Sequence, residues 1–260
     1  MSTPVARITL RLRLPAVVSA AVGLIAVMAA LGALFPNVGH TIGRLSIPRS
    51  VSNLLGGGDY GTITGWFRSE IAAIYGPLVI GALAITGASA STAGEEEDRI
   101  LGLVLAHPIP RPRLIAAKAA AIGAVVLIVA FATWIGLVVG VAFAGGGITL
   151  AHITALAIQL AFFGFATGAL AIALGAGTGL RSLATGVTAA VAILGWLINS
   201  FAPLVSALDW LKYLSPFFYY AGHDPLTQGV DVAGVVVLGL VSAALTGLGM
   251  IGIQRRDLRA

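Results

Sequence analysis

The sequence predicts an all-helical membrane protein whose helices cross the bilayer six times. Hydrophobic residues make up 58% of the 260-residue chain, charged residues make up only 10%, and the mean hydropathy is +1.00. A water-soluble domain carries about 25% charged residues, so this chain is suited to lipid. Six apolar runs each reach the roughly 20 helical residues that cross a hydrocarbon core. A single transmembrane domain covering residues 1–260 is therefore expected.

The six expected spans are rich in small and aliphatic residues and nearly free of charge. They cover residues 15–35, 71–93, 119–143, 153–176, 183–204 and 232–253. The first span follows basic residues, as in a signal peptide, but its apolar core is too long for one, so we expect it to be retained. Glycine and proline inside the spans are compatible with membrane helices, where neighbouring helices satisfy freed backbone groups.

Lysine and arginine are divided unevenly between the two sides of these spans. One side holds eleven of the 15 cations: Arg7, Arg11, Arg13, Arg99, Arg111, Arg113, Lys118, Arg181, Arg255, Arg256 and Arg259. The other side holds Arg44, Arg49, Arg68 and Lys212. Because loops rich in positive charge tend to stay in the cytoplasm, both termini and the loop at residues 94–118 are expected there. The chain is thus expected to be a multi-pass protein of the cell membrane.

Several kinds of chemistry are excluded by what the sequence lacks. It has no cysteine, which rules out disulfides, thiolate metal sites and a cysteine nucleophile. A phosphate-binding loop needs Gly-x-x-x-x-Gly-Lys-Ser/Thr, and neither Lys118 nor Lys212 has that context. The basic residues flank apolar runs, which disfavours nucleic acid as a partner. His223 and Asp224 alone are too few ligands for a metal. We expect no catalytic residue, cofactor or metal in this chain.

The densest cluster of charge is GEEEDRILGLVLAHPIPRPRLIAAK, residues 94–118. Four consecutive acids cannot lie in hydrocarbon, so the second span must end near Gly94. The acids are expected to open a new helix, where negative charge suits the positive end of the helix dipole. Glu95 lies four residues before Arg99 and is expected to pair with it.

The helix expected after these acids has an apolar face. Its apolar residues recur at helical spacing and are Ile100, Leu101, Val104 and Leu105. Pro108 disfavours helical geometry at the preceding residue and so ends the helix. The alternative is a solvated charged loop. Such a loop has no need of an apolar face, so we expect lipid headgroups or a cytoplasmic partner to cover these residues.

Aromatic residues cluster in the segment 206–231, between the fifth and sixth spans. Tryptophan and tyrosine favour the boundary between hydrocarbon and water. We therefore expect an outer interfacial belt formed by Trp210, Tyr213, Phe217, Phe218, Tyr219 and Tyr220. Contact with membrane lipid is favoured for this belt over stacking on a substrate.

The stretch at residues 4–14 has the pattern of a short interfacial helix. Val5, Ile8 and Leu12 fall broadly on one side of such a helix, and two arginines fall on the opposite side. An unstructured basic leader is the alternative.

Two motifs resemble those of type-2 ATP-binding-cassette (ABC) transporter permeases. The coupling segment of that family commonly has an acidic start, a Leu-rich helix, a proline, an arginine a few residues later and a lysine that opens the next span. The matching residues here are Glu95, Glu96 and Glu97, then the residues from Leu101 to Leu105, and then Pro108, Arg111 and Lys118. Many members have Gly-Thr where this chain has Arg99-Ile100. The second motif, DWLKYLSPFFYYAGHDPL at residues 209–226, is similar to the outer segment of the family.

The resemblance implies a permease that works with a second permease subunit, expected to be a copy of itself, and two copies of a separate ATPase. ATP and Mg would bind to that ATPase, whose groove would receive the coupling helix. The residues expected to couple to it are Glu95, Glu96, Glu97, Arg99, Leu101, Val104, Leu105, Pro108 and Arg111. The stretch 4–14 would be an elbow helix. The expected function is export of a hydrophobic or amphipathic substrate, with a maturation or ion-extrusion role as the second choice within the family.

An ion-coupled secondary transporter or a channel without an ATPase is the main alternative. Such proteins usually carry ionisable residues inside the membrane, whereas these six runs are essentially uncharged, with Gln159 and Asn199 as their large polar residues. This argues against proton coupling. Sodium coupling through broken helices is disfavoured because no paired interrupted spans occur in the two halves. A membrane-embedded enzyme ranks last, since the zinc-protease pattern His-Glu-x-x-His is absent and the GASAS stretch at residues 87–91 fits helix packing.

Overall fold

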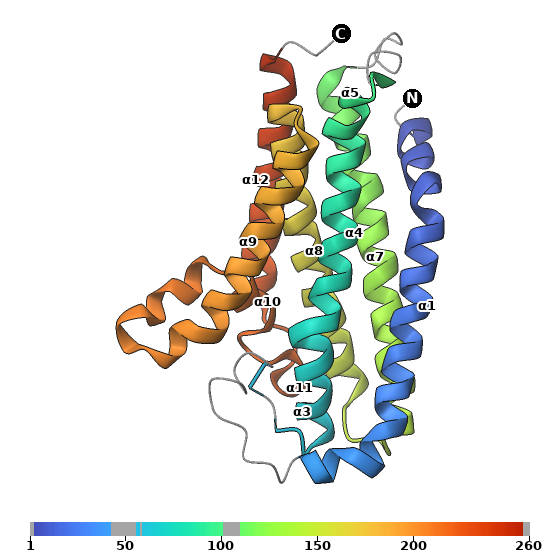
Figure 1. Ribbon diagram of the computed structural model, residues 1–260, viewed down its shortest axis with the longest axis vertical. Helices are drawn as coiled ribbons and strands as arrows, with labels where there is room; N and C mark the ends of the chain where they lie inside the picture. Colours follow the sequence, from blue (N-terminus) through green and yellow to red (C-terminus); the bar gives the residue numbers. More distant parts are fainter. Residues whose placement is uncertain (1–2, 43–55, 58, 101–109, 257–260) are drawn as a thin grey trace.

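Six long helices run alongside one another between the two ends of the molecule (Figure 1). The computed structural model describes residues 3–42, 56–57, 59–100 and 110–256. Within these ranges, the helices long and apolar enough to cross a membrane are Arg7–Gly39, Ile63–Glu97, Arg111–Phe143, Leu150–Thr178, Arg181–Leu204 and Val232–Arg255. They correspond in order to the six expected spans, which confirms the prediction of an all-helical, six-span architecture for the described part of the chain.

The first span belongs to one helix of 40 residues, α1 (Thr3–Ile42). The stretch 4–14, expected to be a helix of its own, forms the first turns of α1 and continues into the span without a break. Pro15 lies inside this helix and does not end it. A membrane helix tolerates proline because neighbouring groups compensate for the missing hydrogen bond. A separate elbow helix is therefore not seen.

The second span is a composite of helical segments that follow one another directly. They are α3 (Ile63–Phe67), η1 (Arg68–Tyr75), α4 (Gly76–Ser89), η2 (Ala90–Gly94) and α5 (Glu95–Glu97). The segments η1 and η2 are wider π-helical turns. Pro77, near the start of α4, has no backbone N–H and its ring crowds the carbonyl four residues earlier, which accounts for a widened turn before it. Such turns inside a helix are frequent at functional sites.

The remaining spans surround a central helix. They are α7 (Arg111–Phe143), α8 (Leu150–Thr178), α9 (Arg181–Phe201) and α12 (Val232–Arg255). The central helix is α8, which packs against α4, α7, α9 and α12, whereas α1 packs along the outside of α7. The contact between α1 and α7 is very close, because a Cβ atom added to Gly32 would lie 2.0 Å from the carbonyl oxygen of Gly140.

Four short helices connect α9 to α12. They are η3 (Ala202–Leu204), η4 (Ser206–Leu214), α10 (Pro216–Ala221) and α11 (Pro225–Gln228). The orange segment that includes η4 projects sideways from the bundle, whereas α10 and α11 lie against it (Figure 1). This connection brings the aromatic segment back to the second and fourth spans.

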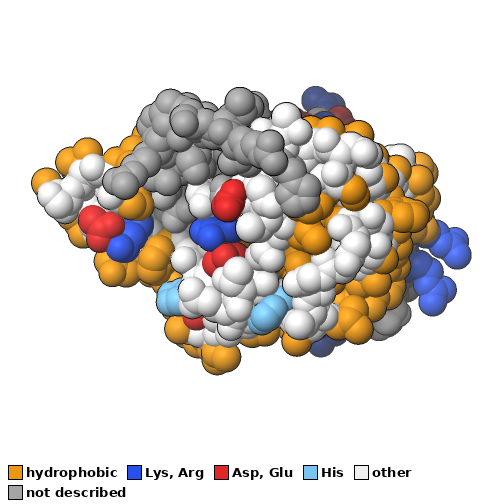
Figure 2. Space-filling view, turned by 90° about the horizontal axis from the view of Figure 1, so that it is seen from below, with side chains coloured by type: hydrophobic (Ala, Val, Ile, Leu, Met, Phe, Trp, Pro, Cys, Tyr) orange, Lys and Arg blue, Asp and Glu red, His pale blue; other side chains and the backbone are white. Residues whose placement is uncertain are grey.

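Both chain ends lie at the same end of the bundle as α5 (Figure 1). We call this the termini end, and the opposite end, where α3 and α11 lie, the far end. Seen from the far end, the surface is mostly hydrophobic or uncharged, with few charged side chains (Figure 2). Most of the described lysines and arginines lie at the termini end, on the first turns of α1, α7 and α9 and at the end of α12, in agreement with their uneven distribution along the chain.

Candidate functional site

The predicted aromatic belt divides into an exposed part and a buried part. Trp210 and Tyr213, on η4, are 59% and 53% exposed and are free to contact a membrane interface. Phe218 and Tyr219 are half-buried. The Tyr219 hydroxyl donates to the backbone carbonyl of Tyr213 at 3.0 Å, which ties α10 to η4.

Phe217 and Tyr220 lie inside the protein, so their predicted place in the belt is corrected. Their rings pack against Phe163 of α8, with centroid distances of 4.8 Å and 5.4 Å. The turn before α10 explains this. The Ser215 hydroxyl accepts a hydrogen bond from the Phe217 N–H and donates one to the Gly195 carbonyl of α9, which directs one face of α10 inward. Burial raises the pKa of the Tyr220 phenol, so this side chain stays neutral.

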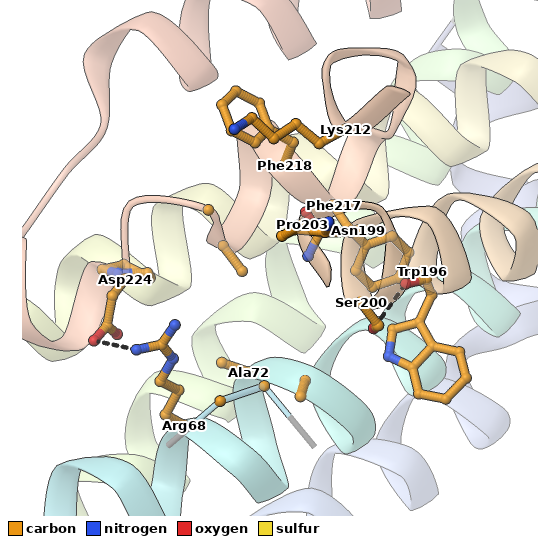
Figure 3. Close-up of a pocket in the computed structure, with 16 residues that line it drawn as sticks. Arg68, Ala72, Trp196, Asn199, Ser200, Pro203, Lys212, Phe217, Phe218 and Asp224 are labelled. Carbon is orange, nitrogen blue, oxygen red and sulfur yellow. Dashed lines mark hydrogen bonds and ion pairs between the residues drawn. The ribbon is translucent and has the colours of Figure 1, made fainter. Parts of the chain in front are cut away.

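A cleft at the far end separates the second span from α9 and α10 (Figure 3). Its polar part encloses about 290 Å³ and is lined by Arg68, Asn199 and Asp224, among others. A neighbouring apolar part encloses about 330 Å³ between α4 and α9. Sequence reasoning missed this cleft, because its walls are separated by more than 100 residues and only the fold brings them together.

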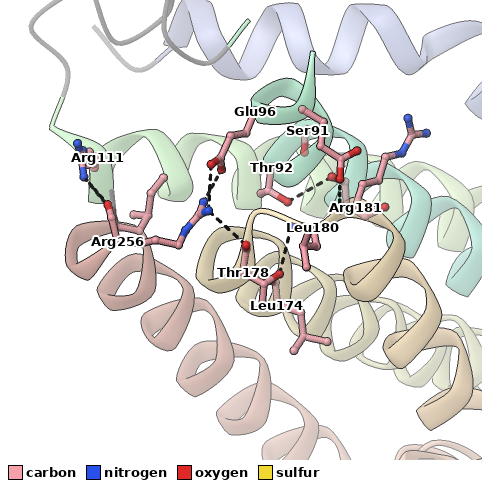
Figure 4. A network of polar contacts seen from close by, with 12 residues as sticks. Ser91, Thr92, Glu96, Arg111, Leu174, Thr178, Leu180, Arg181 and Arg256 are labelled. Carbon is pink, nitrogen blue, oxygen red and sulfur yellow. Dashed lines mark hydrogen bonds and ion pairs between the residues drawn. The ribbon is translucent and has the colours of Figure 1, made fainter. Parts of the chain in front are cut away.

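At the termini end, three consecutive carboxylates close the second span and contact three different elements. Glu95 accepts a hydrogen bond from the Lys118 ammonium of α7 at 2.6 Å. Glu96, which is buried, accepts from both terminal nitrogens of the Arg256 guanidinium, at 2.9 Å for the Nη1 contact (Figure 4). Glu97 accepts from the backbone N–H of Arg181, the first residue of α9, at 2.8 Å. We call these three residues the carboxylate cluster.

The carboxylate cluster ends a helix and does not begin one, which corrects the sequence-based prediction. At the C-terminal end of the second span the helix dipole disfavours negative charge, so these carboxylates need partners from elsewhere. Glu95 pairs with Lys118 and not with Arg99 as predicted. Arg99 instead has a left-handed backbone, φ 59°, and its backbone N–H donates a hydrogen bond to the Glu96 carbonyl at 3.0 Å. This turn ends the helix before a new one can start.

Lys118 is the most deeply buried cation of this region, with its side chain only 1% exposed. Its ammonium also donates to the backbone carbonyl of Ser91 in η2. A buried charge is expensive unless it is paired and hydrogen-bonded. Glu95 and Ser91 together meet that need, so α7 is fixed to the last turns of the second span.

Arg256 joins the end of α12 to two other helices. Besides Glu96, its guanidinium contacts the backbone carbonyl of Thr178 at 3.2 Å (Figure 4). Gly179 follows with φ 65°, a left-handed backbone that favours glycine, and a Cβ there would displace the Arg256 guanidinium, which lies 2.1 Å from its position. Arg111 donates to the carbonyls of Ile253 and Arg256, at 3.2 and 3.1 Å. No sequence pattern singled out Arg256 beyond its positive charge.

The structure brings together only part of the predicted coupling residues. Glu95, Glu96, Glu97 and Arg111 all lie in this network of contacts. Ile100, the first residue of the predicted apolar face, is 46% exposed. Four other predicted coupling residues lie outside the described part of the chain: Leu101, Val104, Leu105 and Pro108.

Comparison with models of known protein families places nearly the whole chain in one family. Residues 1–254 match the family described as the C-terminal domain of the multidrug efflux system permease Rv1217c. A search of curated proteins gives no match. The match covers all six candidate spans except Arg255, the last residue of α12.

Proposed function

This chain belongs to the family of the C-terminal domain of the multidrug efflux permease Rv1217c, and from this we propose that it is the membrane-spanning subunit of an ABC exporter. The substrate is a hydrophobic or amphipathic drug, and the energy comes from ATP hydrolysis on a separate ATPase that binds ATP and Mg. The sequence supports this division, because it contains no phosphate-binding loop of its own.

The carboxylate cluster is the observation that carries the proposal. It lies immediately before the predicted coupling helix, and its partners lie on the third, fifth and sixth spans. A force applied to the segment after α5 therefore reaches several spans through charged contacts. This is the arrangement needed if docking of an ATPase is to move the transmembrane helices, in the way that the resemblance to type-2 permeases implies.

The proposed orientation places the termini end in the cytoplasm. Eleven of the 15 lysines and arginines belong to that side of the spans, and positively charged segments are retained in the cytoplasm. The carboxylate cluster then faces the compartment that contains ATP, and the cleft between α4 and α9 faces the opposite side of the membrane.

A complete exporter of this design contains a second membrane unit and two ATPase subunits. Large apolar side chains remain exposed on α9 and η4, including Ile193, Leu194, Trp210 and Leu214. Lipid covers part of such a surface, and a second permease subunit covers the rest. A homodimer of this chain is the simplest such assembly.

Labelling of single cysteines tests the proposed orientation, because the chain has no cysteine of its own. Cysteine at Leu150 or Gln228, both exposed at the far end, should react with a membrane-impermeant maleimide added to intact cells. Cysteine at the exposed Asp98 should react only after the cells are permeabilised. Equal labelling of Asp98→Cys before and after permeabilisation would contradict the orientation.

The source of energy is tested by transport in proteoliposomes. The permease alone should not hydrolyse ATP above a detergent blank and should co-purify from its native membrane with an ATPase that has a phosphate-binding loop. Liposomes that contain both should export ethidium or carboxyfluorescein only when ATP is supplied. Export driven by a proton or sodium gradient in the absence of the ATPase would instead support the ion-coupled alternative and overturn the proposal.

A further inference from the structure

The polar and apolar parts of the far-end cleft adjoin one another. Ala73, Trp196 and Phe217 line both parts. The apolar part continues along α4 and α9 past Leu78 and Ile193, both of which are also exposed on the outer surface of the bundle. The two adjoining parts therefore extend along the candidate membrane-spanning helices α4 and α9.

The polar part contains an arginine with unused hydrogen-bond donors. Arg68 Nη1 donates to Asp224 Oδ2 at 2.9 Å, and the side chain of Arg68 is 31% exposed toward the cleft (Figure 3). A guanidinium has five N–H donors. Asp224 is its ion-pair partner within the described residues, so most of these donors stay available for a ligand.

The polar part would hold an anion through the donors of Arg68 that its ion pair with Asp224 leaves over. Among the described residues, the charged residues that line it are Arg68, Lys212 and Asp224. Arg68 is paired with Asp224, and Lys212 is paired with Asp209. Lys212 is hydrogen-bonded to Asp209 at 2.7 Å, and this bond raises the pKa of the ammonium, which stays charged. The Asn199 amide, which lines the same space, adds further donor capacity.

We propose that this cleft binds an amphiphile with an anionic headgroup, a carboxylate or a phosphate, held by Arg68, with its apolar tail between α4 and α9. The planar guanidinium matches the geometry of both headgroups. Trp196 and Phe217 lie where head and tail join, and the wall beyond them is uncharged. The inference that such an amphiphile is exported rests on the proposed function. The inference that the cleft binds it does not.

Asp224 acts in this site as a built-in competitor for the headgroup. Its Oδ2 atom accepts from both Arg68 and the Thr227 hydroxyl, at 2.9 and 2.8 Å. A ligand anion must share Arg68 with this carboxylate. Removing the carboxylate charge should therefore strengthen binding of an anion, and removing the guanidinium should weaken it. A purely structural role for the ion pair predicts that both changes act in the same direction.

Binding can be measured by quenching of Trp196 fluorescence in nanodiscs of phosphatidylcholine without any ATPase. The probes are ω-bromododecanoate and ω-bromododecyltrimethylammonium, which share a brominated tail that quenches tryptophan and differ in headgroup charge. Trp196→Phe protein gives the background from the three other tryptophans. We expect saturable quenching by the carboxylate at lower concentrations than by the ammonium. Inorganic phosphate should not displace the carboxylate probe, because it has no tail.

Matched variants decide the role of Arg68. Arg68→Gln should weaken binding of the bromododecanoate probe about tenfold, the effect of losing one charge-assisted contact, and Asp224→Asn should strengthen it. Arg113→Gln, which removes the same charge from an exposed position at the termini end, should have no effect. Weaker binding in both Arg68→Gln and Asp224→Asn, stronger quenching by the ammonium probe, or displacement by inorganic phosphate would each overturn the assignment. None of these results would bear on whether an ATPase drives export.

Discussion

Replacing Arg256 with glutamine is expected to reduce both the stability of the protein and its ATP-driven transport. The Glu96 side chain is only 2% exposed and would lose two charge-assisted hydrogen bonds from the guanidinium. Removing one partner of a buried ion pair costs roughly 3 to 5 kcal/mol, and we expect about 3 kcal/mol or less here because the Arg256 side chain is 20% exposed. Thermal unfolding of the purified protein measures this loss.

Two further variants separate the ion pair from a general effect of charge. Arg255→Gln removes the same charge from an exposed neighbouring position and should leave stability nearly unchanged. The double variant Arg256→Gln with Glu96→Gln removes both charges and should recover part of the stability. Equal losses in the Arg255 and Arg256 variants, or no recovery in the double variant, would show that the pair does not hold α12 to the second span.

Replacing Glu95 with glutamine is expected to destabilise the protein more than replacing its ion-pair partner, Lys118. Glu95→Gln leaves the Lys118 ammonium, only 1% exposed, without a carboxylate, and an uncompensated buried charge costs roughly 3 to 5 kcal/mol. Lys118→Met leaves instead the Glu95 carboxylate, which is 24% exposed and has access to water. The order of destabilisation should therefore be Glu95→Gln first and Lys118→Met second, measured as the shift in unfolding temperature.

Glu97→Gln is the matched control for Glu95→Gln. Glu97 is exposed, and glutamine retains an acceptor oxygen for the Arg181 N–H. Its unfolding temperature should therefore stay close to that of the parent protein, with only the favourable charge at the start of α9 lost. If Glu97→Gln and Glu95→Gln are equally unstable, burial of Lys118 is not the cause.

Membership of the efflux permease family confirms the resemblance to ABC exporter permeases that two motifs indicated. The acidic stretch before the third span lies at the termini end, whereas the Tyr-Leu-Ser-Pro-Phe segment lies in the connection between α9 and α12. The hydrophobic composition predicted the six spans. A helix that crosses a hydrocarbon core needs a long uncharged run, and such runs can be recognised in the sequence alone.

Local reasoning was less successful where partners lie far apart in the sequence. The sequence predicts that Glu95 pairs with Arg99, the nearest cation at helical spacing, whereas its partner in the structure is Lys118, 23 residues away. Similarly, the six aromatic residues of the predicted belt look alike in the sequence. Only the turn at Ser215 decides that Phe217 and Tyr220 face Phe163 while Trp210 remains exposed.

The sequence by itself determined the number of spans, their order and the uneven distribution of charge, since these depend on hydrophobicity along the chain. The tertiary structure alone decided which charges meet. Glu96 and Arg256 are 160 residues apart, and Arg68 and Asp224 are 156 apart. Each pair forms because the packing of α8 against its neighbours brings the ends of separate helices together. Coulomb attraction falls with distance in space and is indifferent to distance in sequence, so no local pattern encodes these contacts.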